Sequence, residues 1–234
     1  MRRQSQPDRP APGADLVFLL DVDNTLLDND SFERDLRTHL TEAHGSDRQE
    51  QYWRIFEQLR TELGYADYLG ALERFRLEYP RDPHLLDTSL FLLLQPFAER
   101  LFPRALDVVA RLERIGPVVI LSDGDVVFQP LKIVRSGLWD VVSSRVLIWI
   151  HKEHMLSEVE RRYPARRYVI VDDKIGILSS VKRSWGPRVT TVFVRQGHYA
   201  LDQELVGRYP EADVSVDRIE DLMDWSIPAP DAGG

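Results

Sequence analysis

An unbroken apolar run that ends in two aspartates constrains this chain most. Residues 16–20 read Leu-Val-Phe-Leu-Leu, a pattern typical of a central strand buried on both faces of a parallel sheet. Asp21 and Asp23 follow at once, and Asn24 and Thr25 then predict a turn. Ligands of open α/β sheets bind beyond the carboxyl ends of the strands, so we expect both aspartates to face one pocket.

The same strand pattern recurs in the second half of the chain. Residues 118–121 predict a strand that ends at Ser122, and residues 168–171 predict one that ends at Asp172 and Asp173. Because helical and strand patterns alternate, we expect a Rossmann-like parallel sheet with right-handed crossovers. Further strands are predicted at 146–148, 190–194 and 214–216, and helices at 104–115, 130–136, 153–163, 175–185, 201–208 and 219–225.

Helical periodicity replaces this alternation between residues 29 and 95, which predicts an inserted all-helical cap domain. The α/β core then comprises residues 15–28 and 96–225, with a disordered lead-in at 1–14 and a loose tail at 226–234. Four cap helices are expected: one from 31 to 44 capped by Asp30, one opened by a capping box at 46–49, one over 67–78, and one after Asp82 whose apolar run 90–94 must be buried.

Composition narrows the class of protein. The 234 residues, 43% of them hydrophobic, suffice for a sizeable core. A net charge of −8 argues against nucleic acid or an acidic membrane as a partner. Cysteine is absent, which excludes disulfides and thiolate sites. No apolar run has the length of a secretory signal or a membrane span, so we expect a cytoplasmic protein.

The hexapeptide Asp21-Val22-Asp23-Asn24-Thr25-Leu26 resembles D-x-D-x-T-[LV], the opening motif of the haloacid dehalogenase-like (HAD) hydrolase superfamily. The other family motifs are a Ser or Thr, a Lys and an acidic pair, in that order. Ser122, Lys152 and Asp172-Asp173 match them in order. The resemblance spans residues 15–225, and four ordered motifs on the expected elements are far more specific than any one of them.

The resemblance implies a role for each residue of the first motif. Asp21 becomes the nucleophile that forms an aspartyl-phosphate, and it is also a metal ligand. Asp23 becomes the general acid and base, and its backbone carbonyl binds Mg²⁺. Mg²⁺ takes oxygen ligands, which this set of residues supplies.

The later motifs are expected to hold phosphate and metal. The resemblance implies that Ser122 and backbone N–H groups near Asp123 and Gly124 bind the phosphoryl oxygens. Lys152 neutralises the phosphate and the nucleophile. Asp172 binds the metal directly, and Asp173 binds it directly, through water or from the second coordination shell.

Each of these residues also has a simpler interpretation. Ser122 and the Asp172-Asp173 pair can cap helices, and Lys152 can pair with Glu153. The chain departs from the family pattern at Asp123, at Glu153 after the lysine, and at Gly176, where a further acid is common. His151 and His154 lack a third predicted nitrogen or sulfur ligand, so we expect them to be surface or hinge residues.

The expected function is that of a Mg²⁺-dependent phosphatase acting on a small phosphorylated metabolite. Asp23 favours phosphoryl chemistry, since haloacid dehalogenases need no acid there. A phosphomutase or phosphotransferase of the same superfamily, or a catalytically silent phosphate-binding module, remains open, as does the oligomeric state. A phosphoacceptor receiver domain fits neither motif order nor length. Candidate substrate selectors are the polar and aromatic cap residues His39, Tyr52, Arg54, Tyr65, Tyr68, Arg74 and Arg76.

Overall fold

The structure is a computed structural model that describes residues 13–226. The predicted lead-in at 1–14 and tail at 226–234 fall mainly on residues outside this range. Ala14 is an exception, because it already belongs to the first strand, β1 (Ala14–Leu20). Within residues 13–226, no helix combines the length and apolarity needed to cross a membrane.

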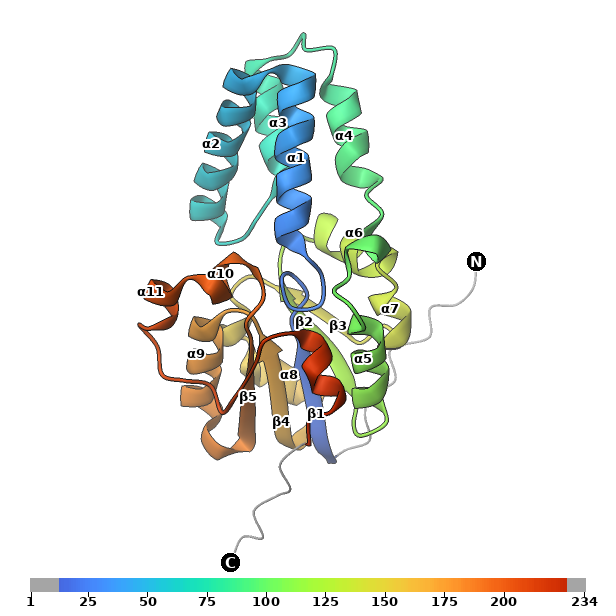
Figure 1. Ribbon diagram of the computed structural model, residues 1–234, viewed down its shortest axis with the longest axis vertical. Coiled ribbons are helices and arrows are strands. Elements are labelled where there is room, and N and C mark those ends of the chain that lie inside the picture. The colour runs from blue at the N-terminus through green and yellow to red at the C-terminus, as the bar shows by residue number, and fades with distance from the viewer. Residues whose placement is uncertain (1–12, 227–234) are drawn as a thin grey trace, which may run out of the picture.

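Residues 13–226 contain a parallel sheet of six strands in the order β3-β2-β1-β4-β5-β6 (Figure 1). This topology confirms the predicted Rossmann-like core. Leu20 pairs with Ile120 of one neighbouring strand and Val171 of the other, so the residues after these strands emerge at one edge. The other strands are β2 (Val118–Asp123), β3 (Val146–Trp149), β4 (Ala165–Asp172), β5 (Val189–Val194) and β6 (Val214–Val216).

Helices cover both faces of the sheet because successive strand residues point to opposite sides. Val17 and Leu19 pack toward α8 (Leu156–Arg162) and α9 (Ile175–Trp185). On the other face, Phe18 shares a core with α5 (Ala105–Glu113), α6 (Phe128–Arg135), α7 (Leu138–Val141) and η4 (Ile219–Met223). The remaining short elements are η1 (Phe97–Arg100), η2 (Lys152–His154), η3 (Gly186–Arg188), α10 (Gly197–Leu201) and α11 (Gln203–Val206).

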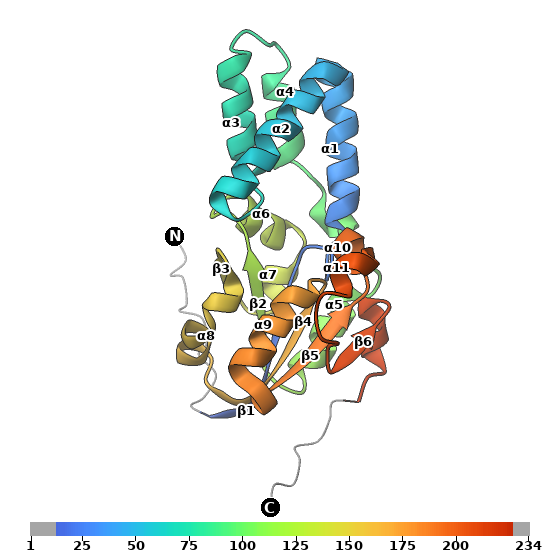
Figure 2. The same cartoon turned by 90° about the vertical axis from the view of Figure 1, so that its left-hand side faces the viewer.

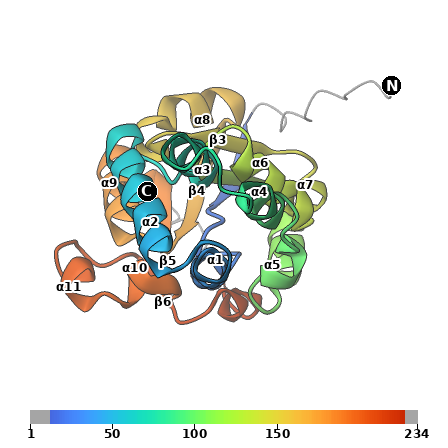
Figure 3. The same cartoon turned by 90° about the horizontal axis from the view of Figure 1, so that it is seen from above.

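A bundle of four helices stands beyond the carboxyl edge of the sheet (Figure 1, Figure 2). Figure 3 shows the same bundle from above, projecting over the strands. Two chain segments join it to the core, and they pair through an antiparallel bridge between Leu27 and Leu101. The helices are α1 (Asn29–His44), α2 (Ser46–Leu63), α3 (Tyr68–Glu78) and α4 (Leu85–Leu93).

The ends of α1 and α2 differ from the prediction. The Asp28 carboxylate, not that of Asp30, accepts the N-terminal hydrogen bond of α1, from Ser31 N at 2.8 Å. Asp30 lies in the first turn and bonds to Asn24 and His198 instead. The predicted capping box of α2 was wrong, because α2 follows α1 so closely that Gly45 takes the cap position.

The predicted burial of residues 90–94 was also wrong. Leu92 is fully buried, but Leu90 is 43% and Leu94 is 60% exposed. The helix α4 packs on α1 and α3 and has no neighbour on its outer side among residues 13–226. The inner face of α4 is therefore buried against the bundle, while Leu90 and Leu94 are exposed to solvent.

An aromatic cluster joins the helical bundle to the core. Phe32 of α1 is fully buried, and its ring centroid lies 5.1 Å from that of Tyr68, 5.9 Å from Phe97 and 5.6 Å from Phe128. Tyr68 belongs to the bundle, whereas Phe128 belongs to α6 of the core. Apolar burial at this junction therefore stabilises the bundle in its place over the sheet edge.

Phe32→Ala should lower the free energy of unfolding by about 3–5 kcal/mol, because it leaves a cavity in a cluster that cannot collapse fully. The matched control is Leu77→Ala on α3, where the side chain is 79% exposed and a change within about 0.5 kcal/mol is expected. Urea denaturation followed by circular dichroism measures both. Equal losses for the two variants would contradict the role given to the aromatic cluster.

Candidate active site

A buried lysine joins two of the predicted site residues. Lys152, at the start of η2, forms ion pairs with Asp21 and, at 2.7 Å, with Asp172 Oδ2. Its ammonium also donates to the carbonyl of Leu121, 3.1 Å away. Three chain segments that are far apart in sequence thus meet at one cation, at the carboxyl ends of β1, β2 and β4.

The loop after β1 is folded by its own side chains. Asn24 has a left-handed backbone (φ 58°), and its Oδ1 accepts hydrogen bonds from the backbone N–H groups of Asn29 and Asp30. The Thr25 hydroxyl donates to Asp21 Oδ2 at 3.3 Å. These bonds give each residue a structural role: Asn24 shapes the turn, and Thr25 orients the Asp21 carboxylate.

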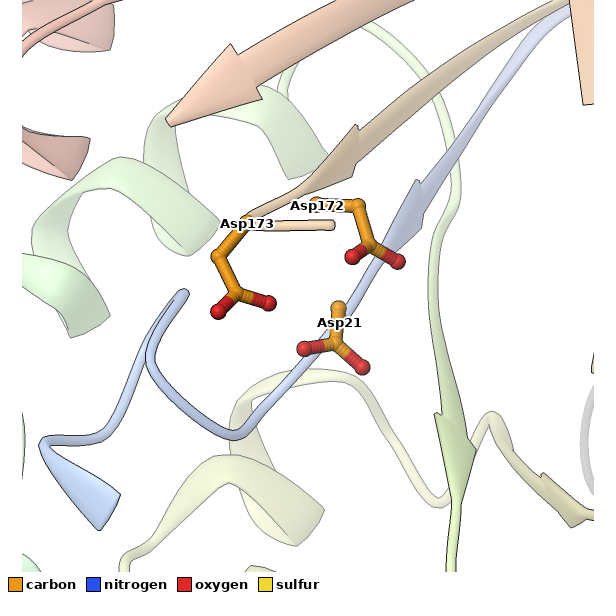
Figure 4. A group of neighbouring side chains, drawn as sticks. All are labelled: Asp21, Asp172 and Asp173. Atoms are coloured by element: carbon orange, nitrogen blue, oxygen red, sulfur yellow. The ribbon is translucent and has the colours of Figure 1, made fainter. Parts of the chain in front are cut away.

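Three buried carboxylates face one another beside Lys152. Figure 4 shows Asp21 at the end of β1 and Asp172 and Asp173 at the end of β4, with their oxygens directed toward a common space. One oxygen from each lies within 4.8 Å of the others. Neither oxygen of Asp173 has a hydrogen-bond partner among residues 13–226, although the residue is buried.

This arrangement fits a divalent cation. A buried carboxylate without a partner is costly, and an ion with oxygen ligands satisfies such groups. Asp21, Asp172 and Asp173 could each supply one ligand atom. The fit rests on the orphaned oxygens of Asp173 and on the all-oxygen donor set.

The charges of the site act on one another through a buried environment. Burial raises the pKa of Asp21 to about 6, although Lys152 acts in the opposite direction. Burial, followed by the charge of Asp172, raises the pKa of Asp173 well above its usual range. Burial lowers the pKa of Lys152, but Asp172 and Asp21 outweigh it and the net shift is upward. The protein therefore holds a cationic Lys152 among carboxylates that repel one another.

Asp23 is placed apart from that cluster and is held by residues that the sequence analysis missed. Its side chain is 28% exposed, and Oδ1 lies 2.7 Å from the ammonium of Lys132. Oδ2 accepts from Gln129 Nε2 at 3.2 Å, and the same nitrogen donates to Ser122 Oγ at 2.9 Å. The scarcity of lysine, with four in the chain, was a signal that could have directed attention to Lys132.

The residues at the end of β2 that were expected to bind phosphate make different contacts. Ser122 is buried, and its hydroxyl oxygen accepts the hydrogen bond from Gln129 Nε2. The Asp123 carboxylate accepts from the backbone N–H of Lys152 at 2.8 Å, so it shapes the start of η2. The backbone N–H of Gly124 donates to the Trp149 carbonyl at 3.1 Å and is therefore occupied in this conformation.

The predicted substrate selectors are scattered. Tyr52 and Tyr68 are buried within the bundle. Tyr65 lines a cavity of about 540 Å³ between the bundle and the core. The residues that line this cavity with Tyr65 are mostly apolar: Asp67, Leu69, Gly124, Asp125, Val126, Val127, Ile148, Trp149, Ile150 and Met155.

The side chains of His151 and His154, which were not assigned to the site, are exposed.

The fold and sequence resemble solved structures closely. A haloacid dehalogenase-like hydrolase from Burkholderia xenovorans is 60% identical, with a TM-score of 0.85, over 90% of this chain and 96% of that one. No protein-family model matches the chain, and no curated protein sequence matches it.

More distant structures share the fold at lower identity. The HAD hydrolase YfnB from Bacillus subtilis, solved with bound magnesium, is 17% identical with a TM-score of 0.59, over 89% of this chain and 97% of that one. L-2-haloacid dehalogenase from Xanthobacter autotrophicus is 20% identical with a TM-score of 0.55, over 88% and 96% respectively.

Asp173→Asn should raise the melting temperature of the metal-free protein by about 2–4 °C, the shift for roughly 1 kcal/mol, because it removes an acid whose ionised form is disfavoured in the folded protein by burial and by Asp172. Saturating Mg²⁺ should raise the melting temperature of the wild type more than that of the variant. Differential scanning calorimetry with EDTA and with Mg²⁺ measures both effects. The control is Asp107→Asn on the surface of α5. A wild-type melting temperature that is indifferent to Mg²⁺ would contradict the metal site.

Proposed function

The chain belongs to the haloacid dehalogenase-like hydrolases, and we propose that it is a Mg²⁺-dependent phosphatase of small phosphomonoesters. The observation that carries the proposal is the placement of Asp23. A partly exposed carboxylate stands two residues after the buried Asp21, on the same loop and linked through Gln129 to Ser122. A carboxylate so placed can exchange a proton with a substrate oxygen.

In the first proposed step, an oxygen of Asp21 attacks phosphorus and forms an aspartyl-phosphate. The bond from phosphorus to the leaving oxygen breaks, and that oxygen takes the electron pair and a proton from Asp23. A carboxylate that approaches a phosphate dianion meets repulsion of about 4 kcal/mol per charge pair at 4 Å in a medium of effective dielectric 20. Lys152, paired with Asp21, offsets part of this repulsion.

In the second proposed step, Asp23 takes a proton from water as the water oxygen attacks phosphorus. The bond between Asp21 and phosphorus breaks, inorganic phosphate leaves, Asp21 returns to its carboxylate form and Asp23 returns to the protonated form in which it began. Asp21, Asp172, Asp173 and the backbone carbonyl of Asp23 would hold Mg²⁺, which supplies positive charge to the phosphate when bound. Ser122 is the candidate hydroxyl donor to a phosphoryl oxygen.

A small substrate is supported by the position of the helical bundle. The bundle lies over the carboxyl edge of the sheet (Figure 3). A bundle in this position is expected to hinder large polymers more than small molecules. The cavity of about 540 Å³ beside Gly124 has room for the organic part of a metabolite-sized ester. Its apolar lining favours a substrate with some hydrophobic surface.

Dehalogenation is the second candidate, because an L-2-haloacid dehalogenase shares the fold. A halide leaves as a weak base and needs no proton, whereas an alkoxide needs one. Dehalogenation would leave Asp23 and its two hydrogen-bonding partners without a chemical task. Phosphoryl transfer to a second substrate, as in a mutase, and phosphate binding without turnover are further outcomes that the same experiment separates.

Wild-type protein should release inorganic phosphate from a panel of small phosphomonoesters with Mg²⁺ and lose this activity in EDTA. Asp21→Asn should abolish turnover, and Asp23→Asn should lower kcat by about 10²–10⁴-fold, because it removes the proton donor and acceptor. Malachite-green detection of phosphate measures both, with Asp107→Asn as the surface control. Halide release from 2-chloropropionate without phosphate release would instead favour a dehalogenase.

A further inference from the structure

We propose that Lys132 and Gln129 are positioning residues that hold the Asp23 carboxylate at its working angle, and that Lys132 ties this carboxylate to the first turn of α1. This inference rests on the proposed phosphatase function, in which Asp23 carries the proton. It adds two side chains of α6 that belong to none of the four sequence motifs. Neither residue reacts with substrate, so their proposed role differs from the proton transfer that is proposed for Asp23.

Helix α6 contacts both oxygens of Asp23. Gln129 and Lys132 stand three residues apart, which places them on one face of the helix. Lys132 Nζ lies 2.7 Å from Oδ1, and Gln129 Nε2 lies 3.2 Å from Oδ2. Two donors at different oxygens restrict rotation of a carboxylate more than one donor does. Gln129 Nε2 also reaches Ser122 Oγ at 2.9 Å, so the same side chain joins the two motifs.

Lys132 extends this contact into the helical bundle. Its ammonium donates to Asn29 Oδ1 at 3.0 Å, and Asn29 is the first residue of α1. Asn29 Nδ2 in turn donates to Tyr68 OH at 3.2 Å, and the Tyr68 hydroxyl donates to Glu33 Oε1 at 2.6 Å. A continuous chain of polar contacts therefore runs from the acid–base carboxylate to α1 and α3.

The burial of Lys132 indicates a specific task. Its side chain is 1% exposed, and taking an ammonium out of water is costly unless it is well paired. Apolar residues of similar volume often replace buried ion pairs without loss of stability. The neighbouring Phe128 ring already provides an apolar wall at this place. The polar contacts to Asp23 and Asn29 explain why a lysine suits the position.

A proton donor held at one angle matters most when the leaving oxygen is strongly basic. An alkoxide cannot leave without a proton, whereas 4-nitrophenolate leaves readily without one. Loss of a residue that positions Asp23 should therefore affect alkyl phosphates more than p-nitrophenyl phosphate. General loss of folded protein would lower both activities by the same factor.

Lys132→Met should lower kcat for an alkyl phosphate that the wild type accepts by about 10²-fold or more, and for p-nitrophenyl phosphate by less than about fivefold. Lys132→Arg should restore part of the alkyl activity, because it returns a cationic donor. Gln129→Leu should show the same order with a smaller loss. Lys182→Met, a surface ion-pair lysine of α9, is the matched control and should change neither rate. Equal losses on both substrates would overturn the positioning role.

A second readout does not depend on turnover. Hydrogen–deuterium exchange of the intact protein should show faster exchange at residues 29–33 in Lys132→Met than in wild type, with no change in Lys182→Met. Unchanged exchange at residues 29–33 would overturn the link to α1. If wild type hydrolyses no phosphomonoester, the proposed function fails, while the exchange result still decides whether Lys132 ties α6 to the bundle.

Discussion

The ion pairs of Lys152 are the interaction on which the rest of the site depends. One buried ammonium holds Asp21 and Asp172, which come from two adjacent strands, and reaches the carbonyl that ends the apolar part of β2. Removing this cation would leave Asp21 and Asp172 buried without the ion pair that joins them, a costly arrangement. Lys152 comes from η2, between β3 and β4, and its charge stabilises the two carboxylates at the edge of the sheet.

Of the three buried carboxylates, Asp173 is the one that forms neither a hydrogen bond nor an ion pair with Lys152 among residues 13–226. Its two oxygens lack partners among residues 13–226, and burial together with Asp172 raises the pKa of Asp173. The next residue, Lys174, is also buried: burial lowers the pKa of this lysine, but the nearby acids, Asp173 foremost, raise it overall. Unpaired carboxyl oxygens in a buried site are suited to a divalent cation. Binding of the cation would stabilise the folded protein.

The helical bundle and the core are connected by two kinds of contact with different consequences. The aromatic cluster around Phe32 is apolar and holds the bundle in place by burial. The polar chain from Asp23 through Lys132 to Asn29 is directional, so it fixes angles as well as distance. Together they connect the position of α1 with the orientation of the Asp23 carboxylate, the proposed acid and base.

Local patterns in the sequence determined where the strands lie and which residues stand at their ends, because buried strands are runs of apolar residues. They also indicated that these residues gather in one place, because parallel strands end at the same edge of a sheet. Tertiary structure alone decided which partners those residues meet. Lys132 and Gln129 lie more than a hundred residues from Asp23 in the chain, and no spacing rule links them. Likewise, Leu90 and Leu94 are exposed because α4 has neighbours on one side, which depends on packing and not on local periodicity.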